Sequence, residues 1–139
     1  MYAEAANEVY GPVTKPAEGD LTAEQALNKV RNRVELEDGT PLAGVDSRYL
    51  SKEKFREFLR DERAVELSFE GHRWYDLRRW YVAHLSKYKE KWILDFDKEH
   101  TYFTPRLYVT KPFEMKHYWL PFQISRVSIY PEFYQNPGW

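Results

Sequence analysis

The chain has 139 residues, which is enough for one domain but not for several. Its net charge of −1 excludes a general electrostatic attraction to nucleic acid or to an anionic membrane surface. It contains no cysteine, so disulfide bonds, thiolate catalysis and cysteine-ligated zinc are excluded as well.

The first expected element is a short helix over residues 2–9. Its apolar residues recur at helical spacing, and Gly11 follows as a stop signal. A helix this short is marginal by itself. Two interpretations are open at this point: the chain begins inside a longer protein, or a frayed N-terminal helix docks on the domain.

Two longer helices are expected next, each preceded by a loop. Residues 21–34 have an amphipathic pattern, with Thr22 as the N-cap and Gln25 as its partner in a capping box. Ser51 then caps a helix that the pattern extends over residues 52–69. Both starts are local signals and predict where the helices begin.

Gly71 interrupts the pattern, and a third helix is expected over residues 72–82. The character of the chain then changes, because residues 81–139 hold 15 of its 24 aromatic side chains and show weak periodicity. A strand is expected near residues 106–109 and a helical turn at residues 123–127. A tail so rich in Tyr and Phe is expected to lie over the domain as an extended segment.

The expected fold class is therefore mainly α, with long, irregular, aromatic-rich loops and an extended C-terminal tail. We expect a single domain over residues 1–139, with a helical part at 1–82 and a loop-rich part at 83–139. With a mean hydropathy of −0.77 and 17% aromatic residues, the core must be built from large amphipathic rings.

Two glutamates stand out on the helix predicted at 52–69. Glu62 and Glu66 fall in the centre of its apolar face. That face consists of Phe55, Phe58, Leu59, Val65 and Phe69. A buried carboxylate must be protonated or paired, and Arg73 lies on the apolar side of the next helix as a possible partner.

The two glutamates have a catalytic and a structural interpretation. A carboxylate pair can do general acid–base work, as in glycosidases. Against catalysis, a pair at positions i and i+4 of one helix is close together and faces packing. A neighbouring arginine also stabilises the ionised form, whereas a general acid must keep its proton. We therefore favour structural ion pairing.

Other candidate residues carry weaker signals. His72 and Asp76 have the i, i+4 spacing of metal ligands, but two ligands are too few, and Asp76 is expected to pair with Arg79 or His72. Arg78 and Arg79 beside aromatics fit RNA contact, but the surrounding acids favour ion pairs. The sequence therefore predicts no catalytic residue, no metal site and no cofactor.

The aromatic residues of 81–139 have two interpretations. Sugar rings pack on Trp and Tyr faces through apolar contact and C–H···π attraction, so these rings are candidates for glycan contact. For any single ring, the core of a loop-rich region is the simpler interpretation. No individual ligand-binding residue is predicted.

The stretch SKEKFREFLRDERAVELSFEGHRWYDLRRW, residues 51–80, resembles the signature of the RagB/SusD family of outer-membrane nutrient-binding lipoproteins. The ending YWLPFQISRVSIYPEFYQNPGW is similar to the family's closing segment, and YAEAANEV and ALNKVRNRV resemble helices just upstream of the signature. The residues that carry the likeness are Glu62-Arg63, Glu66-Leu67, Phe69 to Arg73, Asp76-Leu77, Arg79-Trp80, Leu120-Pro121, Gln123, Ile129 and Gln135 to Trp139.

The resemblance implies the C-terminal part of a longer, lipid-anchored protein with tetratricopeptide-like helical hairpins. Such proteins lie on the outer face of the outer membrane and are not enzymes. They hold oligosaccharides or peptides for a SusC-like TonB-dependent transporter. The resemblance implies no cofactor, no nucleic acid and no membrane contact beyond the lipid anchor. No ligand residue is carried over, and Glu62, Glu66 and Arg73 would form a structural cluster.

Two further functions are open from the residues. The chain could be a helical scaffold or adaptor that binds a protein partner through its aromatic loops. It could also be a hydrolase that uses Glu62 and Glu66.

Overall fold

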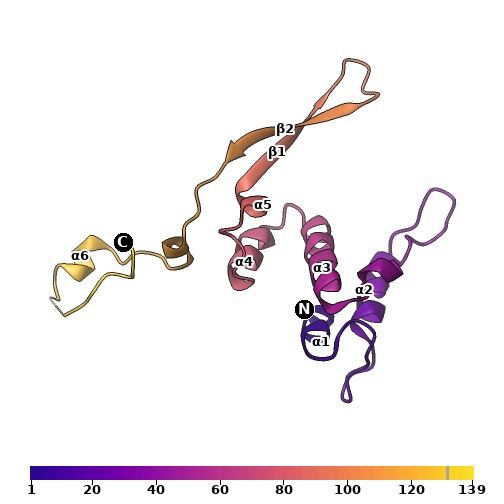
Figure 1. The fold of residues 1–139 in the computed structure, drawn as a ribbon, viewed down its shortest axis with the longest axis horizontal. Helices are drawn as coiled ribbons and strands as arrows, with labels where there is room; N and C mark the ends of the chain where they lie inside the picture. Colours follow the sequence, from indigo (N-terminus) through magenta and orange to yellow (C-terminus); the bar gives the residue numbers. More distant parts are fainter. Residues whose placement is uncertain (131) are drawn as a thin grey trace. The chain divides into compact units, whose positions relative to one another are not determined.

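The computed structural model describes residues 1–130 and 132–139 of the chain. The chain forms two compact units, Met1–Glu70 and Gly71–Trp139. Figure 1 shows the order of the elements along the chain. Within the described residues, no helix is long and apolar enough to cross a membrane. That the whole chain acts as a single domain stays a prediction.

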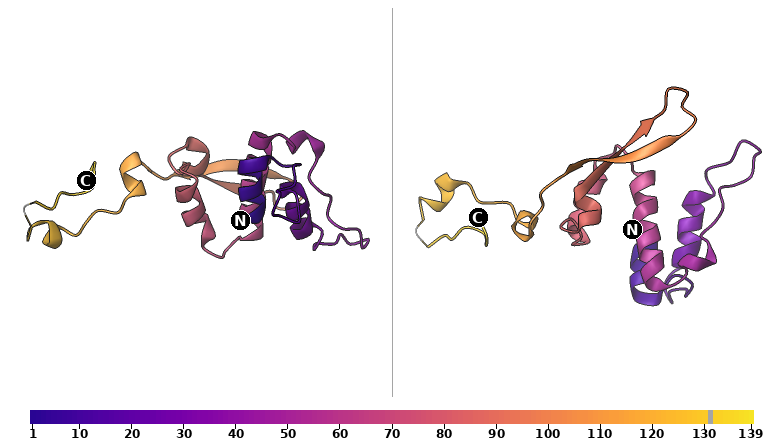
Figure 2. Two further views of the ribbon diagram at one scale, coloured as in Figure 1. Left: turned by 90° about the horizontal axis from the view of Figure 1, so that it is seen from below. Right: turned by 45° about the horizontal axis from the view of Figure 1, so that its top comes forward.

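The first unit is helical. It contains α1 (Tyr2–Tyr10), α2 (Ala23–Arg31), a 3-10 turn at Ser47–Tyr49 and α3 (Lys52–Glu66). Helix α1 packs against both α2 and α3 (Figures 1 and 2).

Both predicted N-caps are confirmed. The Gln25 amide donates to Thr22 Oγ1 at 3.1 Å, and the Thr22 amide donates to the Gln25 side chain at 3.0 Å, which completes the capping box. Ser51 Oγ accepts a longer bond, 3.4 Å, from the Lys54 amide. These bonds need only neighbouring residues, so the sequence alone could place them.

The core of the first unit is small and centres on Phe55, which is fully buried at 0% exposure. The other buried members of the cluster are Ala6, Ala23, Leu27, Val45 and Leu59. Ala6 of α1 and Ala23 of α2 belong to the same cluster as Phe55 of α3, so all three helices contribute to this core. Phe58 packs at the edge of the cluster and lies 4.8 Å from the ring of Tyr49.

Helix α3 ends three residues earlier than predicted. The Ser68 hydroxyl donates to the carbonyl oxygens of Ala64 and Val65, and Phe69 has a left-handed backbone with φ 66°. A side-chain bond of this kind competes with the helical pattern. Val65, in the last turn of α3, and Phe69, beyond it, are exposed, so the predicted apolar face is buried only in its first half.

Helix α2 also ends earlier than the predicted residue 34. The amides of Arg33 and Val34 bond to carbonyls three residues back, which tightens the turn. The Val34 carbonyl then accepts from the Leu42 amide at 2.8 Å. This loop contact draws the chain out of the helix.

The second unit combines short helices with a β-hairpin. Its elements are α4 (His72–Arg79), α5 (Ser86–Lys89), β1 (Glu90–Phe96), β2 (Phe103–Thr110), a 3-10 turn at Met115–Tyr118 and α6 (Ile124–Val127). Strands β1 and β2 pair antiparallel and form a two-stranded ribbon (Figure 1). The register shifts between Lys91 and Trp92, where the ribbon has a bulge.

The hairpin partly corrects the sequence analysis. The strand predicted at 106–109 lies within β2, but β1 was not predicted. The described residues of both strands are mostly exposed, so neither has the alternation of a half-buried strand that would reveal it in sequence. The helical turn predicted at 123–127 is confirmed as α6. Helix α4 ends at Arg79 rather than at residue 82.

The C-terminal segment folds back on its own unit. The Gln135 side chain accepts from the Phe122 amide at 2.8 Å and donates to the Phe122 carbonyl at 2.9 Å. Trp139 Nε1 donates to the carbonyl oxygens of Lys116 and Trp119, both at 3.1 Å. The described part of the tail is therefore held by side-chain to backbone bonds.

Replacing the central core ring should destabilise the first unit strongly. We expect Phe55→Ala to lower the free energy of unfolding by about 3–5 kcal/mol, because the buried ring leaves a cavity. Urea-induced unfolding followed by circular dichroism measures the change. Phe69→Ala is the matched control; its ring is exposed, and it should stay within about 0.5 kcal/mol of the unchanged protein. Equal losses for the two variants would contradict this core.

The ion pair between α1 and α3 predicts a pH dependence. Arg56 Nε and Nη2 donate to the Glu8 carboxylate at 2.5 and 2.7 Å, and this bonding lowers the pKa of Glu8 below 4.5. A lowered folded-state pKa contributes stability above pH 4.5 that is lost as the pH falls through the folded value. Glu8→Gln should therefore be less stable than the unchanged protein at pH 7, and the difference should shrink below pH 4.5.

Thermal unfolding between neutral pH and acid pH measures this difference. Glu18→Gln is the control, because Glu18 is exposed in a loop. A Glu8→Gln difference that stays constant down to low pH would show that the pair contributes nothing through Glu8 ionisation.

Candidate functional site

The two glutamates singled out in the sequence are ion-paired, as predicted, and the structure assigns their partners to α2 and the turn after it. Arg31 Nη1 lies 2.5 Å from Glu62 Oε2, and Arg33 Nη2 pairs with Glu66 Oε1. The side chains of Arg31 and Glu62 are only 14% and 18% exposed. Arg31 Nε also donates to the Ala43 carbonyl at 2.9 Å, so this guanidinium ties α3 to both α2 and the following loop.

Arg73, which the sequence suggested as the partner of Glu62 and Glu66, lies near aromatic rings of the second unit. Its guanidinium carbon lies 5.3 Å from the ring centroid of Tyr88 and 5.9 Å from that of Trp80. The pairing of Arg31 and Arg33 with the glutamates could not be foreseen, since it depends on how the ends of α2 and α3 meet.

Glu62 and Glu66 also line a cavity of about 240 Å³ in the first unit. Its other walls are mainly apolar and include Tyr2, Leu27 and Leu59. The expectation that the glutamates face only packing is therefore wrong. Each carboxylate is nevertheless bound by a guanidinium, so both already have a structural partner.

The remaining sequence candidates have structural partners. Asp76 is 4% exposed, and its carboxylate accepts from Arg79 Nε at 3.1 Å, as predicted. Among the described residues, no group of three or more His, Cys, Asp or Glu could hold a metal ion. The His72–Asp76 spacing therefore does not extend to a metal centre there.

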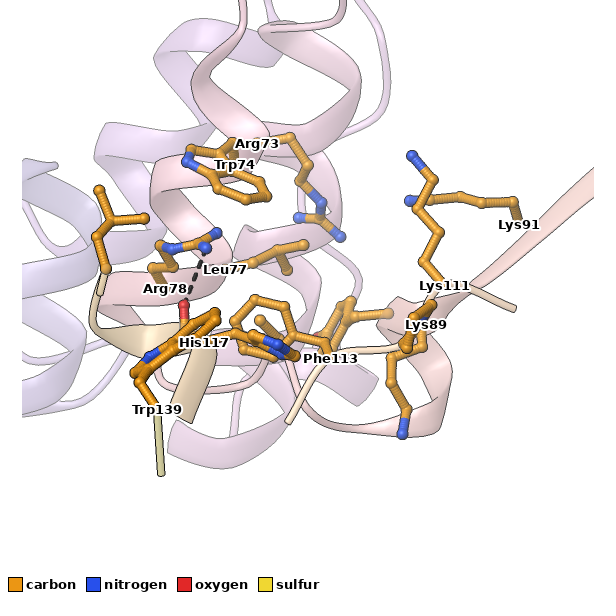
Figure 3. Close-up of a pocket in the computed structure, with 14 residues that line it drawn as sticks. Arg73, Trp74, Leu77, Arg78, Lys89, Lys91, Lys111, Phe113, His117 and Trp139 are labelled. Carbon is orange, nitrogen blue, oxygen red and sulfur yellow. Dashed lines mark hydrogen bonds between the residues drawn. The ribbon is translucent and has the colours of Figure 1, made fainter. Parts of the chain in front are cut away.

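A pocket of the second unit has a volume of about 510 Å³, within the range of small-ligand sites. Helix α4 forms one wall with Arg73, Trp74, Leu77 and Arg78 (Figure 3). These positions are spaced i, i+1, i+4 and i+5, which places them on one side of the helix.

Arg78 organises this wall. Its guanidinium carbon lies 3.3 Å from the ring centroid of Trp74 and 5.0 Å from that of Phe113. Its Nη2 donates to the His117 carbonyl oxygen at 3.0 Å. Burial lowers the pKa of Arg78, because the charged form loses hydration there. The stack fixes α4 against the segment that follows β2.

Another part of the lining comes from the base of the hairpin. Lys89 ends α5, Lys91 lies in β1, and Lys111 follows β2; all three line the pocket. The Lys111 amide donates to the Lys89 carbonyl at 2.9 Å, which continues the strand pairing by one bond. In Figure 3 the ammonium ends of Lys91 and Lys111 lie on the same side of the pocket as Arg73.

Aromatic side chains complete the lining. Tyr88, Phe113 and Trp139 join Trp74, and His117 meets Trp139 edge-on at 5.4 Å between ring centroids. Trp139 is anchored by two bonds, one to Lys116 in the Met115–Tyr118 turn and one to Trp119 directly after it. Rings held in this way offer flat apolar faces beside cationic donors.

The sequence analysis did not single out this pocket. It considered the aromatic residues of 81–139 as glycan contacts and favoured a core role for each; Tyr88, Phe113 and Trp139 instead line a cavity. Nothing in the sequence marked the pocket lysines as neighbours, except that Lys89 and Lys91 lie together in KYKEK at 87–91. Only the hairpin register brings Lys111 to them.

Comparison with known proteins supports the family resemblance that the motifs of the α3–α4 region indicated. The sequence profile of the SusD family matches residues 1–139. The chain belongs to the SusD family.

Individual relatives of this SusD-family chain support the assignment. It is 33% identical over 134 residues to the SusD-like protein P25 of Formosa agariphila, a match that covers 94% of this chain and 20% of that protein. A crystal structure of a SusD-like protein from Bacteroides fragilis NCTC 9343 has 25% identity and a TM-score of 0.69, covering 99% of this chain and 23% of that one. The chain thus spans about a fifth of the curated relative's length. The helical character agrees with that fold, and the tetratricopeptide-like hairpins stay a prediction.

Removing one charge of the Arg31–Glu62 pair should cost stability. We expect Glu62→Gln to lower the free energy of unfolding by about 1–3 kcal/mol, because Arg31 keeps a largely buried charge without its counter-ion. Chemical denaturation measures the loss. Glu57→Gln, an exposed position on the same helix, is the matched control and should change stability by less than about 0.5 kcal/mol. A stable Glu62→Gln variant would contradict a structural role.

Proposed function

We propose that this chain is part of a non-catalytic protein that binds an oligosaccharide nutrient and delivers it to a TonB-dependent transporter. The site of action in this proposal is the outer face of the bacterial outer membrane. Membership of the SusD family supports nutrient and glycan binding in general.

The observation that carries the proposal is the pocket of the second unit. Its aromatic residues Trp74, Tyr88, Phe113 and Trp139 offer ring faces, and arginines and lysines beside them offer hydrogen-bond donors. Saccharides present both apolar C–H faces and hydroxyl groups, so a site that combines rings with donors suits them.

The contacts of the glutamates support binding without catalysis. A glycosidase needs one carboxyl group that keeps its proton and a second that acts as base or nucleophile. Here Glu62 and Glu66 are both paired with arginines. The contacts of these two carboxylates therefore favour a structural role over the hydrolase hypothesis.

A protein-binding adaptor is the second candidate, and the β1–β2 hairpin favours it. Several of its large apolar side chains are about half exposed or more, among them Trp92, Phe96, Phe103 and Tyr108. Exposed apolar groups gathered on one element are typical of interaction surfaces.

Calorimetric titration of the protein with an oligosaccharide panel tests the first proposal, with reducing ends measured in the same samples. We expect saturable binding without release of reducing ends. Release would overturn the non-catalytic proposal, and folded protein that binds none of the panel would favour the adaptor.

Trp74→Ala should weaken binding by about three- to tenfold, since an aromatic stack contributes on the order of 0.5–1.5 kcal/mol. Trp92→Ala is a matched control, because Trp92 has almost the same exposure, 56% against 55%, but lies outside the pocket. Equal weakening by both variants would move the site away from the pocket.

A further inference from the structure

The pocket of the second unit carries charge of one sign only. Five of its lining residues are basic, namely Arg73, Arg78, Lys89, Lys91 and Lys111, and none is acidic. The chain as a whole has 22 acidic and 21 basic residues, so a random sample of its surface would be nearly neutral. The positive charge of the pocket is therefore a local feature.

The three lysines at the base of the hairpin have no ion-pair partner among the described residues. Lys111 bonds Lys89 through the backbone, and Lys91 lies two residues further along β1. Like charges that gather across paired strands repel one another. The nearest acid in sequence, Glu90, accepts from Trp92 Nε1 at 3.2 Å. An external anion would relieve this repulsion, which no ion pair of the described residues compensates.

Arg78 adds a preorganised donor. Its guanidinium is held between Trp74 and Phe113 and donates one hydrogen bond, to the His117 carbonyl, among the described residues. An arginine has five N–H donors in a planar fork that matches a carboxylate or a sulfate. Because burial already removes part of its hydration, a polar ligand group beside it would replace the lost solvation.

We infer that this pocket binds a negatively charged sugar residue, one that carries a carboxylate or a sulfate ester. The acidic group would contact Lys91 and Lys111 at the base of the hairpin, while the pyranose ring would pack on Trp74 or Trp139, where Arg78 could donate to its hydroxyl groups. A neutral sugar would use the rings but leave the lysines without a counter-charge. This inference rests on the proposed saccharide binding and narrows its substrate class.

A saccharide fits this pocket better than a polyanion such as RNA. Binding along a nucleic-acid backbone uses an extended basic surface. Here five basic residues line one cavity of about 510 Å³, in a chain of net charge −1.

The test compares three tetrasaccharides of equal length by calorimetry: a uronate oligomer, a sulfated oligomer and a neutral one. At about 20 mM NaCl, we expect at least one charged oligomer to bind about tenfold tighter than the neutral one, and the preference to fall at about 200 mM NaCl. Which charged oligomer binds tighter identifies the acidic group. A single-stranded oligonucleotide is included, and tighter binding of it than of either charged saccharide would overturn the inference.

Variants that remove lysine charges test whether the preference for charged oligomers arises in the pocket. Lys91→Gln combined with Lys111→Gln should reduce the ratio of charged to neutral affinity by about tenfold. Lys98→Gln is the matched control, since Lys98 is an exposed lysine outside the pocket, and it should keep the ratio. Circular dichroism checks folding. If the double variant does not fold, the single Lys111→Gln variant gives the same comparison.

The outcomes separate this inference from the proposed function. Binding of neutral and charged oligomers with equal affinity would overturn the charge preference and leave saccharide binding in place. Binding of no saccharide by folded protein would overturn both. An equal fall in the affinity ratio for Lys98→Gln and for the double variant would overturn the assignment to the pocket.

Discussion

Each unit is held together by an arginine that contacts both aromatic rings and oxygen atoms. In the second unit, Arg78 lies between the rings of Trp74 and Phe113 and donates to the His117 carbonyl. In the first unit, Arg31 pairs with Glu62, donates to the Ala43 carbonyl and lies over the ring of Phe58. The structure depends on these arginines because few aliphatic side chains are buried in its core. Only eight apolar residues are buried among those described, and three of them are alanines. Guanidinium groups that stack on rings and bond to oxygens therefore hold segments that apolar burial alone would not.

This way of building a core has a functional consequence. Rings that are stacked on arginines on one face stay partly exposed on the other, as Trp74 does at 55%. The same contact that fixes the ring also keeps a cation next to it. A ligand with an apolar face and polar substituents then meets groups that are already in position, which reduces the ordering cost of binding. Structure and binding would share the same side chains in the second unit.

The helix starts were predictable and the helix ends were not. Thr22 with Gln25, and Ser51, act through bonds that span three residues, so their pattern is visible in the sequence. The end of α3 depends on the Ser68 hydroxyl and on the left-handed backbone of Phe69, which the periodicity of the helix hides. Strand β1 was missed because a hairpin held mainly by backbone pairing needs no alternating pattern.

The order and spacing of the motifs in residues 51–80 and at the C-terminus were enough to place the chain in the SusD family, because such motifs are a property of the sequence itself. The sequence also determined that Glu62 and Glu66 must be paired, since a carboxylate on an apolar helix face needs a counter-charge. Only the tertiary structure decided that the partners are Arg31 and Arg33. It alone brought Lys91 and Lys111 into the same pocket as Trp74 and Arg78, because strand register and helix packing set contacts between residues far apart in the chain.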